Sequence, residues 1–336
     1  MARLLIAGVP DEVHVGRHLL SAARSLRIDA EISNMRDAQK APWLVKKVNW
    51  FLRGHRPGAM ECYCKELIEQ CRAFRPDLLL CTGICPVDRK TLLAIGELGI
   101  VSANFLTDDP FNPRHHAPWF MSTLPHYDRI YTPRRANMED LRNAGCKSVE
   151  YLPFAYAPDV HYPDSCESTQ SDLPASDVVF AGGGDRDRMP YAKALINAGL
   201  KVALYGGQWN RFISARPYWR GYGSASTIRK ALKSAKIALC LVRRANRDGN
   251  CMRTFEVPAT GCCMLTEDTA DHRELFGAEG QAVLYFNSVP EMVEKAKWLV
   301  NNRPERIRLA AEAYNRITSG GHSYADRLTT ILRSVA

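Results

Sequence analysis

Short apolar runs separated by amphipathic stretches recur through the first half of the chain. The runs that predict buried strands are LLIAGV (4–9), DLLLCTG (77–83), IVSANFL (100–106), DRIYTP (128–133) and SVEYLP (148–153). Between them, helix-like patterns cover about 14–26, 89–98 and 135–144, and Gly145 ends the last of these. Strands that alternate with helices in this way predict a parallel sheet covered by helices.

A polar segment rich in Pro and Ser, from about Ala155 to Ser176, interrupts this pattern. A second series of predicted strands follows at 177–182, 201–206, 236–242, 262–267 and 282–286. Two helical patterns come next, then a break at Gly320 and Gly321 and a final helix from about Ser323. The predicted division is a first domain at 1–155, a linker at 156–176, a second domain at 177–318 and a C-terminal helix within 319–336.

The length and the cysteines agree with this division. The 336 residues are too many for one typical core and suit two α/β domains of about 150 residues each. No apolar run approaches the ~20 residues that span a bilayer, and the start MARLLIAGVPDEV lacks the blocks of a signal peptide. The eleven cysteines are odd in number and scattered, which predicts reduced cysteines and a cytoplasmic protein. Cys62, Cys64 and Cys71 form no CxxC pair, which argues against zinc.

Positive charge is concentrated in one part of the sequence. Residues 201–250 contain eleven Lys or Arg and a single acid, Asp248, a local excess of +10 against +9 for the whole chain. Residues 151–200 hold three basic and seven acidic residues. This distribution favours a local anion site over a general polyanion surface, although nucleic acid stays open as a partner.

A glycine turn in VVFAGGGDRDR (178–188) is the first candidate for that anion site. Gly182, Gly183 and Gly184 end a predicted strand and let phosphate oxygens approach the backbone, while Arg186 and Arg188 supply charge at the start of a helix. A flexible turn with solvated arginines is the alternative. A nicotinamide site is disfavoured, because the next strand, KVALYGGQWN, carries no acid for the ribose.

The second candidate lies in RDGNCMRTFEVPATGCCMLTE (247–267). Asp248 and Glu256 stand eight residues apart where a basic loop enters a helix at about 252–260. From this helix Glu256 can accept both hydroxyls of a ribose, while Arg253 and the free helical amides address a diphosphate. Asp248 is placed to meet the hydroxyls of a sugar. Alternatively, Glu256 is an ordinary acid that the helix dipole stabilises.

A third set of polar residues follows the strand at 100–106. Asp108 and Asp109 are candidates for the base that orients or deprotonates an acceptor hydroxyl, with His115 or His116 as a rival. The alternative is that the Asp-Asp-Pro sequence only caps a turn. A retaining mechanism would need no such base.

The segment APWLVKKVNWFLRGHR (41–56) mixes large apolar and basic residues. This pattern is compatible with an anionic membrane surface or with grip on an acceptor, and so with peripheral membrane contact. The alternative is a helix or loop packed on the first domain. His322 and Tyr324, at the start of the final helix, are interpreted as packing residues.

Taken together, these motifs resemble a known family. The run from Ser224 to Glu267, with its Asp-x7-Glu spacing and RTFEVPATG helix start, resembles the donor-binding half of GT-B glycosyltransferases, specifically the CgeB-like (spore maturation protein) group. FAGGGDRDR, DLLLCTG, NFLTDDP, YLPFAYAPDVHYP and HSYADR resemble further segments of that group in consistent order. The resemblance implies an α/β GT-B fold: two Rossmann-like doubly wound domains facing across a cleft, with the C-terminal helix returning to the first domain.

The resemblance also implies a function and a set of site residues. A nucleoside-diphosphate sugar would be the co-substrate and a hydroxyl acceptor of unknown class would approach the first domain, with no cofactor and no obligatory metal. By position, Glu256 would hold the ribose, Asp248 the donor sugar, and Arg253 and Arg188 the diphosphate. Thr254, in the same helix start, is a further donor-binding candidate.

One residue departs from the pattern of that family. Related retaining enzymes usually carry Glu at both ends of the x7 spacing, and this chain has Asp248 at the first. The expected activity is transfer of a sugar to a hydroxyl group with retention. A noncatalytic protein that binds nucleotide sugars or nucleic acid, and a glycosyltransferase acting on modified nucleic acid, are the alternatives.

Overall fold

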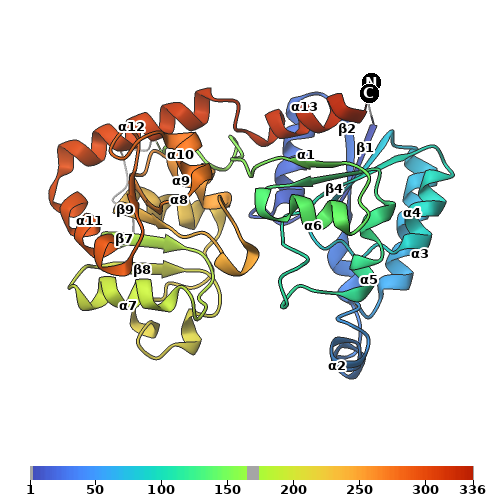
Figure 1. The fold of residues 1–336 in the computed structure, drawn as a ribbon, viewed down its shortest axis with the longest axis horizontal. Helices are drawn as coiled ribbons and strands as arrows, with labels where there is room; N and C mark the ends of the chain where they lie inside the picture. Colours follow the sequence, from blue (N-terminus) through green and yellow to red (C-terminus); the bar gives the residue numbers. More distant parts are fainter. Residues whose placement is uncertain (1–2, 165–173, 336) are drawn as a thin grey trace. The chain divides into compact units, whose positions relative to one another are not determined.

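The computed structural model describes residues 3–164 and 174–335, and the chain divides into two compact units (Figure 1). Unit 1 comprises Met1–Pro153, Ala245–Asp248 and Tyr324–Ala336, and unit 2 comprises Phe154–Arg244 and Gly249–Ser323. The predicted linker at 156–176 therefore includes nine residues, 165–173, that lie outside the described part.

Unit 1 is built on one parallel sheet. Its strands are β1 (Arg3–Gly8), β2 (Asp29–Asn34), β3 (Leu78–Thr82), β4 (Val101–Phe105), β5 (Arg129–Thr132) and β6 (Val149–Tyr151). Its helices are α1 (Val15–Ser25), α2 (Trp43–Leu52), α3 (Met60–Phe74), α4 (Arg89–Gly96), α5 (Pro118–Met121), α6 (Met138–Asn143) and α13 (Tyr324–Val335). The strand order is β2-β1-β3-β4-β5-β6, and every neighbouring pair is parallel.

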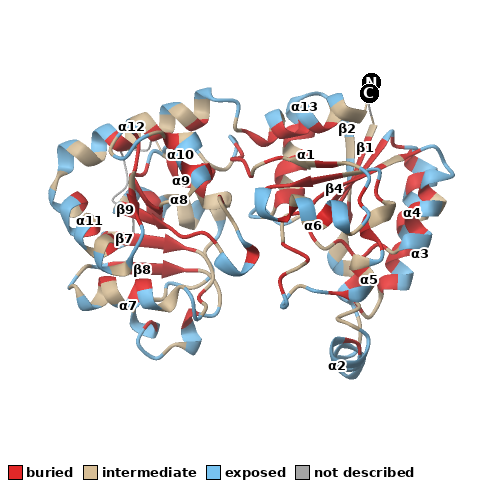
Figure 2. Ribbon diagram, in the orientation of Figure 1, coloured by how far each residue is buried: buried red, intermediate tan, exposed pale blue. Residues whose placement is uncertain are grey.

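Strands β1 and β3 of unit 1 are largely apolar because helices cover both faces of the sheet. All five residues of β3 are buried, and Figure 2 shows other strands of both units, such as β4 and β7, coloured as buried. The glycine pair Gly8 and Gly16 lets α1 approach the end of β1, since a Cβ at Gly16 would lie 2.9 Å from the backbone of Val9. At the far end of the chain α13 packs on α1, where Tyr324 stacks on His18 with ring centroids 5.2 Å apart. The prediction that the last helix returns to the first domain is confirmed.

Unit 2 repeats this architecture with different sequence. Its strands are β7 (Ser176–Ala181), β8 (Val202–Tyr205), β9 (Ala235–Cys240), β10 (Met264–Glu267) and β11 (Leu284–Phe286). Its helices are α7 (Met189–Asn197), α8 (Ala225–Ser234), α9 (Met252–Ala259), α10 (Ala270–Phe276), α11 (Val289–Asn301) and α12 (Arg303–Ser319). The strand order is β11-β10-β9-β7-β8, again parallel.

Both sheets confirm the predicted α/β class and the doubly wound topology. In unit 2 the chain runs from β7 to its neighbour β8 on one side and then to β9 on the other, so the strand order reverses between β7 and β9. A crevice opens at such a switch point beyond the carboxyl ends of the strands, where ligands bind in open α/β sheets. The glycine turn follows β7, and the loop to α9 follows β9. The topology thus brings the two candidate motifs of the second domain to one edge of one sheet.

The sequence patterns missed strand β2 and helix α3 of unit 1, as well as the short helix α5. Strand β2 lies at the edge of the sheet and only Ser33 is buried, so its sequence DAEISN lacks an apolar run. Helix α3 buries one face that includes Tyr63, Leu67 and Cys71, a helical spacing that the interspersed charges conceal.

Candidate functional site

The glycine turn lies at the carboxyl end of β7, where the topology predicts a ligand site. The amides of Gly182 and Gly184 donate to carbonyl oxygens at the end of β8 and in the turn after it, both over 2.8 Å. A Cβ at Gly184 would lie 2.7 Å from the ring of Trp209, whereas one at Gly183 would meet only the carbonyl of Gly207, at 3.6 Å. Packing therefore demands glycine at 184, and Gly183 is the position that is open to close approach.

Two arginines that the sequence predicts to bind the diphosphate converge on this turn. Arg253, in the first turn of α9, donates from Nε to the carbonyl of Ala181 over 2.8 Å. Arg188 donates from Nη1 to the carbonyl of Gly183 over 2.9 Å. Both guanidinium groups therefore lie beside the backbone that the chain presents at the end of β7. Arginine donors and a glycine turn are the combination that suits a phosphate group.

Helix α9 is fixed at its start by a buried hydrogen-bond chain. The hydroxyl oxygen of Thr254 accepts the amide of Cys251 over 3.0 Å and lies 2.9 Å from Nε2 of His272. Nδ1 of His272 lies 2.7 Å from the carbonyl of Glu267, which can only accept, so Nδ1 carries the hydrogen and Nε2 accepts from Thr254. Burial lowers the pKa of His272 to about 4, so the ring is neutral near pH 7.

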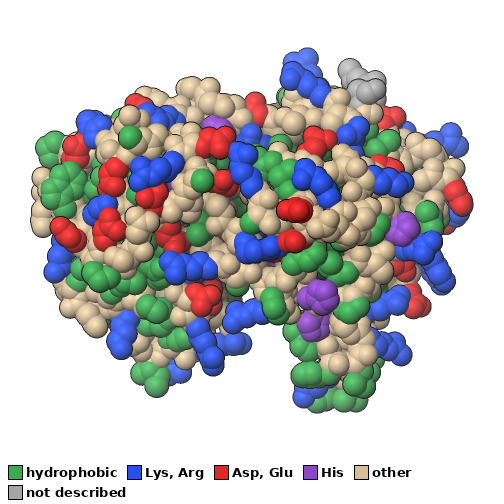
Figure 3. Space-filling view, in the orientation of Figure 1, with side chains coloured by type: hydrophobic (Ala, Val, Ile, Leu, Met, Phe, Trp, Pro, Cys, Tyr) green, Lys and Arg blue, Asp and Glu red, His purple; other side chains and the backbone are tan. Residues whose placement is uncertain are grey.

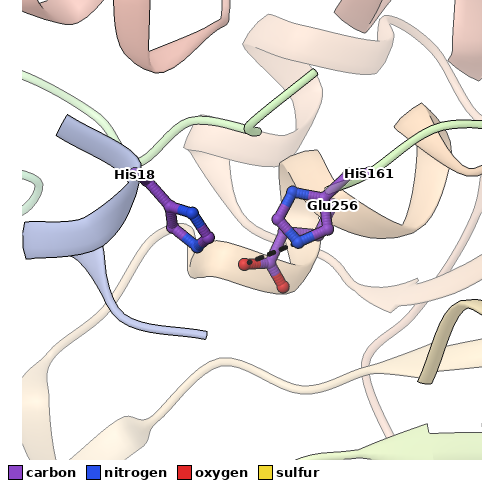
Figure 4. A group of neighbouring side chains, drawn as sticks. All are labelled: His18, His161 and Glu256. Carbon is purple, nitrogen blue, oxygen red and sulfur yellow. Dashed lines mark ion pairs between the residues drawn. The ribbon is translucent and has the colours of Figure 1, made fainter. Parts of the chain in front are cut away.

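Glu256 is a buried carboxylate on the same helix. It pairs with Arg253 one turn earlier. It also lies beside His161, whose Nε2 is 3.6 Å from Oε1 (Figure 4). The other ring nitrogen of His161 accepts the amide of Ala157 over 3.0 Å, so a neutral ring presents Nε2–H toward the carboxylate. Glu256 is thus held by two nitrogen donors, rather than being an exposed acid at the helix dipole.

The basic stretch at 201–250 is neutralised in part by acids outside it. Lys236 lies 2.8 Å from Asp177, and Arg244 lies 3.0 Å from Glu267 at the carboxyl ends of β9 and β10. Arg244 donates hydrogen bonds to the Glu267 carboxylate, and this pairing raises the pKa of Arg244. The local excess of +10 in the sequence therefore overstates the positive field of the folded chain, because distant acids supply partners.

The structure places Asp248 in unit 1. Its carboxylate pairs with Arg134, and both side chains are almost fully buried, at 5% and 1% exposure. Arg134 also donates to the carbonyl oxygens of Leu106 and Thr107, over 3.0 and 2.6 Å. These contacts join Asp248 to the ends of two strands of unit 1, while Glu256 belongs to unit 2.

The acids after β4 differ from each other. Asp109 is fully buried, accepts the amide of Phe111 over 3.2 Å and lies 2.9 Å from Arg247. Arg247 donates a hydrogen bond from Nε to the Asp109 carboxylate, and this pairing raises the pKa of Arg247. Asp108 is 40% exposed, and Nδ1 of His115 lies 3.8 Å from its carboxylate. Only Asp108 therefore has the access that an acceptor base requires.

The predicted residues thus fall into two groups. Unit 2 gathers Gly182, Gly183, Gly184, Arg188, Arg253, Thr254 and Glu256 around the ends of β7 and β9, whereas Asp108, Asp109 and Asp248 belong to unit 1. Sequence reasoning missed His161, His272 and Arg134. Arg134 carried a usable signal, since it is a basic residue directly after a predicted strand. His161 and His272 carried none, because each reaches its partner across the fold.

Comparisons with known proteins bear on these observations. A family described as glycosyl transferase-like matches residues 189–333, which include α9 with Arg253, Thr254 and Glu256 but begin just after the glycine turn and Arg188. A search of the curated proteins gave no match. The family match supports the predicted glycosyltransferase class over this part of the chain.

Solved structures match over the whole chain. HepE from Anabaena, in complex with UDP and glucose, has a TM-score of 0.65 and 12% identity, covering 100% of this chain and 99% of its own. Sucrose-phosphate synthase from Thermosynechococcus elongatus has a TM-score of 0.69 and 10% identity, with coverage of 100% and 99%. A protein assigned as a UDP-N-acetylglucosamine 2-epimerase from Listeria monocytogenes has a TM-score of 0.58 and 12% identity, with coverage of 99% and 96%.

Identities of 10–12% establish the architecture rather than the activity. The chain has the α/β fold of GT-B glycosyltransferases and carries a glycosyl transferase-like segment at residues 189–333.

Proposed function

We propose that this chain is a glycosyltransferase that moves a sugar from a nucleoside-diphosphate sugar to a hydroxyl acceptor, with retention of configuration. The observation that carries the proposal is the convergence of Arg253 and Arg188 on the glycine turn after β7, one helical turn from Glu256. The finer assignment to the CgeB-like group is part of the same proposal.

The donor lies at the carboxyl edge of the unit 2 sheet. Arg253 and Arg188 neutralise the diphosphate, and Gly183 admits its oxygens to the backbone. Glu256 exchanges its contact with His161 for the two ribose hydroxyls, each of which can donate a hydrogen bond to a carboxylate. UDP is the first nucleotide to test, because structures of HepE contain UDP and UDP-glucose.

The reaction requires that the diphosphate leaves as the acceptor oxygen bonds to the anomeric carbon. Positive groups around the diphosphate stabilise the charge that develops on it. Asp108 is the group proposed to orient the acceptor hydroxyl, the leaving diphosphate takes up the hydroxyl proton, and no metal or other cofactor takes part. The free state of each described cysteine supports a reducing, cytoplasmic setting.

Calorimetric titration of the full chain with UDP, GDP, ADP and dTDP sugars tests donor binding. Glu256→Ala is expected to weaken binding by at least about tenfold, a loss of about 1.4 kcal/mol. Glu256→Gln preserves the side-chain volume and tests the charge if the Ala variant folds poorly. Glu294→Ala removes an exposed carboxylate of α11 and serves as the matched control. Unchanged affinity in both Glu256 variants would sink the assignment of this site.

Product analysis separates the reaction classes. Release of the nucleoside diphosphate with transfer to an added hydroxyl acceptor, unaffected by a chelator, is the expected result. The likeness to a protein assigned as an epimerase makes C2 epimerisation of the donor sugar the second candidate. Donor binding with neither turnover would favour a noncatalytic binding protein, and steeply salt-dependent duplex binding would favour a nucleic-acid acceptor.

A further inference from the structure

Helix α2 of unit 1 exposes an unusual amount of apolar surface. Its exposed apolar side chains are Trp43, Leu44, Val45, Val48, Trp50, Phe51 and Leu52, and Phe51 and Leu52 are 75% and 80% exposed. Among the residues of α2 only Asn49 is buried. Figure 2 shows the helix as a mostly exposed element that projects from its unit beyond α5. Apolar patches of this kind mark interaction sites in soluble proteins.

The segment that carries α2 makes close contacts at both of its ends, although the side chains of the helix are exposed. The amide of Ala59 donates to the carbonyl of Ala38 over 2.8 Å, which closes the base of the segment. A Cβ at Gly58 would collide with Cβ of Ala41, so the chain segments that enter and leave the projection pass each other closely. At the end of α2 a Cβ at Gly54 would lie 2.7 Å from the ring of Pro118. The segment is therefore an ordered projection with an apolar tip.

One side of α2 combines apolar residues with positive charge. Leu44, Val48 and Phe51 follow i, i+4, i+7 spacing and share a face of the helix. Nζ of Lys47 lies 4.3 Å from the centre of the Trp43 ring. Figure 3 shows basic side chains among the apolar ones over this helix.

The charge of the projection has a single sign. Residues 38–60 contain five Lys or Arg and no Asp or Glu. Lys40 and Arg56 pair with acids next to the segment, at 2.7 and 3.4 Å. Among the described residues, no acid forms an ion pair with Lys46, Lys47 or Arg53, which are all exposed.

We propose that α2 docks on an anionic lipid surface, with its apolar side chains in the boundary between headgroups and acyl chains and its cations on lipid phosphates. Apolar residues with interspersed lysines are what an interfacial helix requires, and the ten residues of α2 are too few to span a bilayer. No helix in the described part of the chain is long and apolar enough to cross a membrane. Tryptophan suits the same boundary because its ring is apolar and its N–H is polar.

Sedimentation of the full chain with sucrose-loaded vesicles tests this docking. The chain is expected to sediment with phosphatidylglycerol vesicles and to remain largely in solution with phosphatidylcholine vesicles. The double variant Leu44→Asp/Phe51→Asp should lower the partition coefficient by about tenfold or more, since it places charge in the apolar boundary. Lys46→Glu/Lys47→Glu should have a similar effect because it removes the attraction to anionic lipid.

Ile213→Asp is the matched control, because Ile213 is 81% exposed but lies in unit 2. It should bind vesicles like the unchanged chain. Equal sedimentation of the Leu44→Asp/Phe51→Asp variant, or no binding to anionic vesicles, would overturn the proposal. If the unchanged chain does not bind vesicles but self-associates, and only the Leu44→Asp/Phe51→Asp variant loses this self-association, the partner of α2 is a second copy of the chain instead. None of these outcomes depends on donor binding, so this inference and the proposed activity fail separately.

Discussion

The hydroxyl of Thr254 lies 2.9 Å from Nε2 of His272, and this buried contact joins the start of α9 to α10. Because Thr254 donates to His272, its oxygen remains free to accept the amide of Cys251. The helix that carries Arg253 and Glu256 is therefore oriented by a histidine outside the predicted site. The chain of bonds requires a neutral imidazole.

This requirement predicts a pH dependence of stability. Burial lowers the pKa of His272 from 6.5 to about 4, so between these values the unfolded chain binds more protons than the folded chain. Neutral His272 contributes fully to the free energy of unfolding above the pKa of the unfolded chain. This contribution is lost as the pH falls from about 6.5 to about 4, and no more is lost below the pKa of the folded chain. The loss from about pH 7 to about pH 5 is about 2 kcal/mol of the free energy of unfolding.

Urea unfolding at the two pH values measures this loss. His272→Gln removes the titrating group. The loss of unfolding free energy between the two pH values should therefore be about 2 kcal/mol smaller in this variant than in the unchanged chain. An equal pH dependence in the variant and the unchanged chain would show that His272 is not the group responsible.

The glycine turn gives a prediction with its control in the same turn. Gly184→Ala should lower the free energy of unfolding by about 1–3 kcal/mol, because the new methyl group overlaps the buried Trp209 ring. Gly183→Ala should leave stability nearly unchanged and weaken UDP binding, since only the approach of phosphate is obstructed. Thermal melting with and without UDP separates the two effects. Equal destabilisation by both substitutions would contradict the packing found here.

Arg253 provides a test of diphosphate binding. Arg253→Lys keeps the charge but loses the planar set of donors, and it should weaken UDP binding by about tenfold while affinity for uridine changes little. Arg273→Lys, at an exposed position of α10 that pairs with Asp268, is the matched control. Calorimetry with UDP and uridine reads out the difference. A similar loss of affinity for UDP and for uridine would show that Arg253→Lys acts by changing the geometry of α9 and not by removing a contact with phosphate.

The buried pair of Asp248 and Arg134 predicts a stability role for Asp248. Asp248→Ala should lower the free energy of unfolding by about 3–5 kcal/mol, because it removes the carboxylate that pairs with the buried charge of Arg134. Asp108→Ala, which truncates a half-exposed carboxylate, should change it by less than about 0.5 kcal/mol. Urea unfolding curves of both variants provide the measurement. A small effect of Asp248→Ala on stability would favour a role of Asp248 in sugar binding over a role in stability.

Much of the architecture follows from local pattern. Apolar runs such as the one in β3 can be buried only in a sheet covered on both faces, and their alternation with helices predicts parallel strands and two doubly wound units. Runs of this kind predicted most strands to within about two residues. The polar edge strand β2 was missed because a strand that is largely exposed needs no apolar run.

The site was determined in part by the same local signals. Glycines after β7 and a basic helix start after β9 are visible in the sequence, and strand order brings them to one edge of the sheet. Tertiary structure decided which groups are partners. It paired Asp248 with Arg134, 114 residues away, and Asp109 with Arg247, 138 residues away.

Charges counted along a segment reveal neither their partners nor their solvation, because both depend on residues that folding brings from elsewhere. The sequence by itself therefore determined the parallel α/β class, most of the strands and the motifs at the strand ends. Only the tertiary structure decided which carboxylates are neutralised inside unit 1, which one is held beside Arg253, and which helix leaves its apolar side chains in water.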